Sequence, residues 1–303
     1  MRIATWNVNS LKARLEKVEW WLERARPDVL LMQETKLTDD DAPLLPFRMA
    51  GYELVHHGEG RWNGVAIAVR DGLDVEDVVT NFGDGPVRDS SAGSGMRAVD
   101  EDDANPFDEA RMLSLRADGA RFLSLYAPNG RVVDSPFYEG KLAWFERLRR
   151  WLDETCDPTA PLVLGGDLNV APSDDDVWDP AAVHGGTHVS EAERAAFQGL
   201  LDWGLVDAYR RLRPEPGRYT WWDYRAGNFH KNFGMRIDHL LVSRPVAERG
   251  VWAEIDREAR KGKPIPSDHA PLFLDIDVPG TPIEAGWEGA AERIARRVGG
   301  TGP

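Results

Sequence analysis

Short polar side chains stand at the ends of the apolar runs, where strands would stop or start. The residues of this kind are Asn7, Asn9, Glu34, Asp167, Asn169, Asp238, Asp268 and His269. In antiparallel neighbours the end of one strand meets the start of the next, so we expect these groups along one sheet edge. Carboxylate and amide oxygens gathered there would bind a hard cation such as Mg²⁺ or Mn²⁺.

These residue types favour metal-assisted phosphoryl chemistry. The set includes no cysteine and no His-x-x-x-His pair, which argues against zinc. Hydrolysis of a phosphodiester requires neutralisation of the phosphate, a base for the water and help for the leaving alkoxide. Taken singly, each of these residues is more often a turn, a cap or an ion-pair partner. Their combination indicates catalysis.

The periodicity of apolar residues predicts the elements that position these groups. Strands are predicted over residues 3–6, 29–32, 52–55, 65–69, 112–115, 121–125, 162–164, 237–242, 251–255 and 272–276. Helices are expected after Ser10, after Ser135-Pro136, and after a capping box formed by Ser190 and Glu193. This order predicts an α/β fold of two packed mixed sheets with helices on the outer faces.

Length and composition fit one catalytic domain over residues 1–278. The polar segment 83–110 is expected to be a mobile acidic excursion, and 279–303 a C-terminal tail in which residues 283–298 could form a short peripheral helix. A single cysteine excludes an intrachain disulfide, and no apolar run reaches the roughly 18 residues of a membrane span. We therefore expect a monomeric, cytoplasmic protein without membrane contact.

The net charge of −14, from 37 basic and 51 acidic residues, argues at first against a polyanionic partner. Part of this excess lies in the 83–110 segment, away from the polar motifs. Bound metal ions would also add positive charge to the site. The charge therefore leaves DNA open as a partner.

Nine segments together resemble the exonuclease III and apurinic-site endonuclease family, within the endonuclease/exonuclease/phosphatase superfamily. They are 4–11 (ATWNVNSL), 27–29 (PDV), 33–36 (QETK), 126–130 (YAPNG), 165–172 (GGDLNVAP), 203–207 (WGLVD), 219–225 (YTWWDYR), 236–239 (RIDH) and 266–271 (PSDHAP). Each motif is moderately specific, and their occurrence in this order is very specific. The resemblance covers the chain to about residue 277 and implies a four-layer α/β sandwich.

The resemblance also implies a site for Mg²⁺ or Mn²⁺. Glu34 is similar to the principal metal ligand of the family, and Asn7, Asn9, Asp268 and Asp167 match positions near the metal. Asn9 stands where some relatives carry Asp.

The catalytic groups that the resemblance implies are Asp167, Asn169, His269, Asp238, Tyr126 and Asn7. Asp167 resembles the residue that activates or positions water, held by Asn169. His269, oriented by Asp238, resembles the group that binds the scissile phosphate. Tyr126 resembles the tyrosine near the phosphate or the leaving group. The sequence leaves the identity of the general base open.

The segment 219–225 is the part of the sequence that best discriminates between substrates. An aromatic residue at Trp221 would line a pocket for a base-less sugar or a terminal nucleotide. Asn129, Lys141, Arg225 and Arg236 are the other predicted substrate contacts. The remaining tryptophans considered are expected in the core, and they are Trp20, Trp21, Trp151 and Trp222.

The function implied is divalent-metal-dependent hydrolysis of duplex DNA in base excision repair. It comprises incision on the 5′ side of abasic sites, 3′-to-5′ exonuclease activity and removal of 3′-phosphate or phosphodiester ends. One alternative keeps this core but acts on RNA, a phosphoinositide or a sphingolipid, since a fold does not fix the substrate. The other is an inactive scaffold that binds DNA.

Overall fold

The computed structural model describes residues 1–84 and 109–289. The acidic segment expected over 83–110 therefore lies almost wholly outside the described residues, as does the chain beyond residue 289. Over 283–289 the chain forms turns and irregular structure instead of a helix. No helix within the described ranges is both long and apolar enough to cross a membrane.

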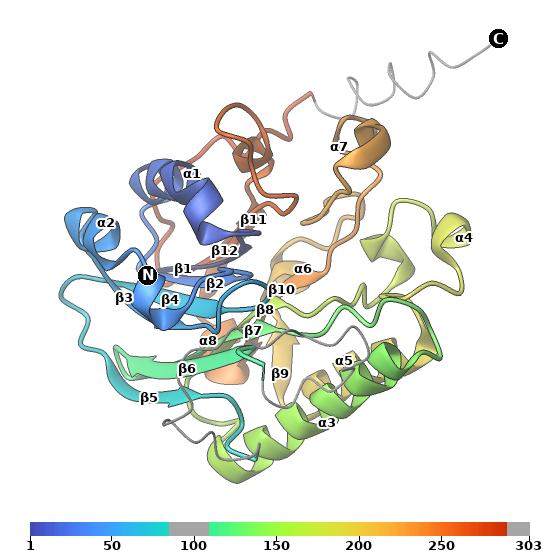
Figure 1. Ribbon diagram of the computed structural model, residues 1–303, viewed down its shortest axis with the longest axis horizontal. Helices are drawn as coiled ribbons and strands as arrows, with labels where there is room; N and C mark the ends of the chain where they lie inside the picture. Colours follow the sequence, from blue (N-terminus) through green and yellow to red (C-terminus); the bar gives the residue numbers. More distant parts are fainter. Residues whose placement is uncertain (85–108, 290–303) are drawn as a thin grey trace.

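Two mixed six-stranded sheets form the centre of the fold (Figure 1). The first, in the order β11-β12-β1-β2-β4-β3, contains β1 (Arg2–Asn7), β2 (Val29–Gln33), β3 (Tyr52–His57), β4 (Val65–Arg70), β11 (Gly250–Ile255) and β12 (Leu272–Ile276). The second, in the order β5-β6-β7-β8-β10-β9, contains β5 (Glu76–Thr80), β6 (Met112–Ala117), β7 (Ala120–Tyr126), β8 (Leu162–Asp167), β9 (Leu205–Asp207) and β10 (Asp238–Ser243). Every predicted strand is present.

Helices cover the outer faces of both sheets (Figure 1). Those on the outer faces are α1 (Leu11–Ala25), α2 (Leu44–Met49), α3 (Pro136–Thr155) and α5 (Glu191–Asp202). The shorter helices are α4 (Pro180–Val183), α6 (Ala208–Leu212), α7 (Asn228–Lys231) and α8 (Arg244–Ala247), and α6 and α8 pack with the core between the sheets. Trp21 and Leu22 of α1 pack with Trp6 outside the first sheet, and Leu148 of α3 packs with Leu164 outside the second. The predicted four-layer α/β sandwich is confirmed.

Side-chain caps begin the three long helices where the sequence predicts them. Ser10 and Ser135 each accept a main-chain N–H from the first turn of the helix that follows, and Ser190 and Glu193 form the expected reciprocal box. Helix α1 links the parallel strands β1 and β2, and α3 links the parallel strands β7 and β8. Each pair is a β-α-β unit whose two strands end at the same edge of their sheet.

The inner faces of the sheets pack directly on each other. Ile3 and Leu31 from the first sheet share one core with Phe122 and Val163 from the second. At Gly165 the approach is so close that an added Cβ atom would lie 2.5 Å from Leu31 Cδ1. A side chain at position 165 would therefore force the ends of the Leu31 and Leu240 side chains to shift.

Strands β5 and β9 and the position of Trp20 differ from the sequence-based expectation. Strand β5 lies at the sheet edge and is mostly polar and exposed, so apolar periodicity did not reveal it. The core prediction for Trp20 is wrong, because its ring is 36% exposed and lies under the Lys17 ammonium. The other three tryptophans expected in the core, Trp21, Trp151 and Trp222, are buried.

Candidate active site

Strand ends from both sheets bring the predicted polar residues to one edge. Asn7 ends β1, and Glu34 follows the neighbouring parallel strand β2. In the second sheet Tyr126 ends β7 beside Asp167 at the end of β8. Asp238, at the start of the antiparallel strand β10, lies directly opposite Asp167. The arrangement of strand ends and starts that the sequence suggests is present in the structure.

Asp167, Asp238 and His269 form a buried cluster in which their polar atoms lie within 4.8 Å of one another. His269 Nδ1 is 2.8 Å from Asp238 Oδ2, and its Nε2 is 3.8 Å from Asp167 Oδ2. Burial alone would lower the pKa of His269, but the two carboxylates raise it to about 10. The imidazole is therefore protonated at neutral pH, and it lies between two acidic side chains.

The Asp167 carboxyl group is held on both of its oxygens. Oδ1 accepts the main-chain N–H of Asn169 at 2.9 Å, and Oδ2 accepts the amide of Asn7 at 2.9 Å. Burial, and next the charge of Asp238, raise the pKa of Asp167 to about 7, against the opposing effect of His269. A carboxyl group that titrates near neutral pH is suited to accept a proton from water.

The Asn7 amide joins this cluster to a second polar group. Its Nδ2, which is fully buried, donates to Glu34 Oε1 at 3.1 Å as well as to Asp167. Glu34 Oε1 also accepts the hydroxyl of Tyr126 at 2.7 Å. Burial and the charge of Glu34 raise the pKa of Tyr126 well above its ordinary value, so its hydroxyl remains a donor.

The oxygen atoms around Glu34 fit a hard cation. Lys36 Nζ lies 3.0 Å from Glu34 Oε2 and 2.7 Å from Asn9 Oδ1, so an ammonium group of the chain already lies between these two oxygens. Asn9 Nδ2 in turn donates to Asp268 Oδ1 at 2.9 Å. Protonated His269 has no free ring nitrogen to ligate a metal. The oxygens near Glu34 therefore suit Mg²⁺ or Mn²⁺ better than the His269 cluster does.

Trp221 lies beside the same group of oxygens. Its Nε1–H donates to Asp268 Oδ2 at 3.1 Å, and its main chain pairs with Met235 and His269. The half-buried ring packs against a small apolar cluster that includes Ile237. An aromatic surface thus adjoins the polar site.

Two buried hydroxyl groups support the site and were missed in the sequence. Ser267 Oγ donates to the carbonyl of Asn7 at 2.7 Å and accepts the N–H of His269 at 3.1 Å. Thr220 Oγ1 accepts the N–H of Asp238 at 3.1 Å. A hydroxyl that bonds only to main chain has no charge or ligand pattern by which the sequence could reveal it.

Two of the predicted phosphate contacts need correction. Lys141 is fully buried and forms an ion pair with Glu193. Arg236 is 1% exposed and forms ion pairs with Asp176 and Asp207. Neither cation is available to a phosphate, because both are buried and already paired with carboxylates from distant parts of the chain.

Arg225 and Asn129 lie at the surface, and their roles as substrate contacts stay predictions. Arg225 is 87% exposed and pairs with Asp223. Asn129 is exposed too, and its Nδ2 lies 3.3 Å from Asn169 Oδ1. Only Asn129 therefore has a direct link to the catalytic cluster.

An exposed Arg-Trp pair was also missed. Trp62 is 52% exposed, and the guanidinium of Arg61 lies 4.7 Å from the centre of its ring. The same turn is joined to the loop that carries Glu34 by a bond from Lys36 N–H to Asn63 O at 2.8 Å. Aromatic and cationic side chains of this kind suit contact with nucleic acid. The sequence Arg61-Trp62 between Gly60 and Gly64 was the available signal.

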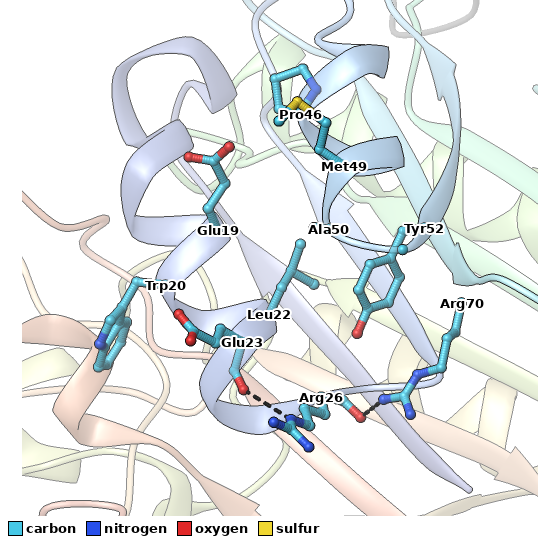
Figure 2. Close-up of a pocket in the computed structure, with 11 residues that line it drawn as sticks. Glu19, Trp20, Leu22, Glu23, Arg26, Pro46, Met49, Ala50, Tyr52 and Arg70 are labelled. Carbon is cyan, nitrogen blue, oxygen red and sulfur yellow. Dashed lines mark hydrogen bonds between the residues drawn. The ribbon is translucent and has the colours of Figure 1, made fainter.

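A groove with a volume of about 790 Å³ lies between α1 and α2 (Figure 2). Its walls include Trp20, Leu22, Met49 and Tyr52, with Arg70 at one end. None of its lining residues belongs to the polar cluster. We assign it no chemistry.

Residues 4–269 match the sequence model of the Endonuclease/Exonuclease/phosphatase family. The chain belongs to this family. The match includes every residue of the polar cluster, from Asn7 to His269. Enzymes of the endonuclease/exonuclease/phosphatase family depend on divalent metals, which agrees with the oxygen-rich group around Glu34.

Relatives within the family are similar along most of their length. Exodeoxyribonuclease III of Haemophilus influenzae is 31% identical over 288 residues, which are 91% of this chain and all of that protein. A solved AP endonuclease from Archaeoglobus fulgidus has a TM-score of 0.80 at 36% identity, covering 92% of this chain and all of the other. A 3′ phosphatase, NExo, from Neisseria, solved with product DNA hairpin, has a TM-score of 0.79 at 38% identity, with the same coverage.

Proposed function

We propose that this chain is a divalent-metal-dependent nuclease that hydrolyses phosphodiester bonds of duplex DNA in repair. Its activities are incision on the 5′ side of abasic sites, 3′-to-5′ exonuclease action and cleaning of 3′ ends. The observation that carries the proposal is the position of Asp167, whose pKa is about 7, opposite the protonated His269. A proton acceptor for water and a cation for the phosphate are thereby placed side by side. The relatives named for AP-endonuclease and exonuclease activity support DNA as the substrate.

The reaction follows from these positions. Asp167 accepts a proton as water attacks phosphorus, the bond from phosphorus to the 3′ oxygen breaks, and the 3′ oxygen takes a proton from solvent water and leaves as the 3′ hydroxyl. The imidazolium of His269, fixed by Asp238, donates to a phosphate oxygen. The hydroxyl of Tyr126, which bonds to Glu34, lies on the metal side of the site. Mg²⁺ or Mn²⁺, held near Glu34, supplies charge neutralisation when bound.

Cleavage of two duplexes tests the proposal. One oligonucleotide duplex carries a single abasic-site analogue, and the other is undamaged with a recessed 3′ end. We expect incision 5′ to the lesion and shortening of the recessed strand with Mg²⁺, and neither with EDTA. Intact DNA after incubation of folded protein with Mg²⁺ or Mn²⁺ would favour a phosphoester that is not DNA.

Asp238→Asn is expected to change the alkaline side of the pH profile. Because the pKa of His269 is raised to about 10, the imidazolium persists through neutral pH and is lost as pH rises through that value. Removal of the Asp238 charge should move the alkaline fall in kcat/KM to lower pH by roughly one to three units. Steady-state rates from pH 6 to 11 measure it, and an unshifted limb would contradict the role of His269 as a cation.

Trp221 variants should separate two contributions to substrate binding. Trp221→Ala removes both the ring and the bond to Asp268, and should weaken binding of an abasic duplex by about 1–3 kcal/mol. Trp221→Phe keeps a ring and removes only the N–H that bonds to Asp268. It should retain most of the affinity but lose turnover. Fluorescence anisotropy with Ca²⁺ in place of Mg²⁺ gives the affinities, and equal losses in both variants would exclude a stacking role.

Several assignments rest on the sequence and stay predictions. These are the catalytic domain over residues 1–278, the monomeric state, the cytoplasmic location and the choice between Mg²⁺ and Mn²⁺. Sedimentation of the protein with and without duplex DNA would test the monomeric state.

A further inference from the structure

Lys141 is a buried cation close to the site, without a part in the proposed chemistry. It belongs to α3 and is 0% exposed. Its Nζ donates to Glu193 Oε1 and, at 2.7 Å, to the main-chain carbonyl of Asn169. Burial of an ammonium ion is costly even when it is paired, so an apolar side chain would serve the core at least as well. The bond to Asn169 is what an apolar residue could not supply.

The Asn169 carbonyl accepts a second donor as well. His188 Nδ1 lies 2.6 Å from the same oxygen. Burial lowers the pKa of His188 to about 4, with the charge of Lys141 adding to this, so the ring is neutral and Nδ1 carries its proton. Asn169 itself has a φ of 53°, in the left-handed region that non-glycine residues rarely adopt. Two donors on one carbonyl hold the turn in that conformation.

The Asn169 turn orients two predicted catalytic groups. Its N–H donates to Asp167 Oδ1 at 2.9 Å, and its side-chain Nδ2 donates to the carbonyl of Ala127 at 2.9 Å. Its Oδ1 faces the amide of Asn129. Any rotation of this turn would therefore move the water-activating carboxyl group and the loop that carries Asn129.

Glu193 extends the same network to the Asn129 loop. Its Oε1 accepts the hydroxyl of Thr187 at 2.8 Å, and that hydroxyl also lies 3.1 Å from the Asn129 carbonyl. At the next residue, Gly130, an added Cβ would be 3.0 Å from Lys141 Cδ. The turns at Asn129 and Asn169 thus both rest on one buried ion pair between α3 and α5.

We propose that the Lys141–Glu193 pair is a positioning element for the reaction, which holds Asp167 and Asn129 in place through the Asn169 turn. Lys141 is a positioning residue that touches no substrate. This inference rests on the proposed function and adds residues from two outer helices to the same site. Charge from Lys141 also acts on Asp167 directly, since Asp167 is among the groups that raise the pKa of Lys141 against the larger effect of burial.

A double-mutant cycle tests this coupling. Lys141→Met is made in the parent and in an Asn169→Ala background, and steady-state cleavage of an abasic duplex is measured with saturating Mg²⁺. In the parent we expect kcat to fall about 10- to 100-fold, as displacements of about 1 Å do, with KM within about threefold. In the Asn169→Ala background the same substitution should cost less, because the Asn169 side-chain bonds to Ala127 and Asn129 are already lost, although its main-chain bond to Asp167 remains.

Arg147→Met is the matched control, because it removes another buried cation of α3 whose partner, Asp84, lies outside the site. It should leave kcat unchanged. No loss from Lys141→Met in the parent, or an equal loss from Arg147→Met, would overturn the proposal. If Lys141→Met does not fold, His188→Phe removes the other donor to Asn169 and leaves the ion pair, and the same two criteria apply. Parent protein that cleaves neither duplex would refute the proposed function instead.

Discussion

Asp167→Asn should lower kcat for abasic-site incision by about 10³- to 10⁴-fold, the size expected for loss of a general base together with part of its hydrogen bonding. An amide cannot accept the proton of the attacking water. It also cannot accept both of the bonds that now hold the carboxylate, from Asn169 N–H and from Asn7. KM should change little, because neither bond is made to the DNA.

Stability distinguishes this loss from misfolding. The pKa of Asp167 is raised in the folded state, so ionisation of this group costs stability as pH rises from its unfolded value toward 7. An uncharged amide escapes that cost, and Tm of the variant at pH 8 should equal or exceed that of the parent. Asp174→Asn, at an exposed carboxylate, is the control and should keep the parent rate. An Asp167→Asn variant within tenfold of the parent rate would exclude Asp167 as the base.

Glu34→Gln should lower Mg²⁺-dependent cleavage by about 10²- to 10³-fold at fixed metal concentration, because a metal contributes several kcal/mol of charge stabilisation. The substitution keeps the size of the side chain and an oxygen for the Tyr126 hydroxyl. It removes the negative charge that now faces Lys36 and would face the metal. Part of the activity should return at high Mn²⁺ or Mg²⁺ concentration, since the defect is in affinity.

Direct measurement of metal binding completes this test. Titration calorimetry with Mg²⁺ should give a weaker Kd for Glu34→Gln than for the parent. Glu23→Gln, on the exposed side of α1, is the control and should bind as the parent does. Unchanged affinity in the Glu34 variant would place the metal elsewhere, and the cluster of Asp167 and Asp238 would be the next candidate.

The sequence predicted the polar edge well because its residues stand at strand ends. Asp167 and Asp238 end and begin long apolar runs, so their chemical contrast with the neighbouring residues is large. Antiparallel pairing then brings them opposite each other without further information. The family resemblance added their roles.

Long-range burial was the part that the sequence did not show. Lys141 looks like a surface cation until Glu193, 52 residues later, is folded against it. Arg236 is misleading in the same way, since its partner Asp176 is 60 residues away. For Trp20 the error was the reverse, because its ring lies at the surface and contacts the charged ends of Lys17 and Arg24 instead of the core. Charge and aromaticity fix what a side chain can bond to, and only the tertiary fold decides which partner it meets.

The close approach of the sheets at Gly165 has a consequence for turnover. Asn7 and His269 belong to the first sheet or its entry loop, while Asp167 and Asp238 belong to the second, so both short contacts between them span the layers. The distance between the two sheets therefore sets the distances between these active-site groups. An added methyl group at Gly165 would force the ends of the Leu31 and Leu240 side chains to move between the layers, close to these contacts.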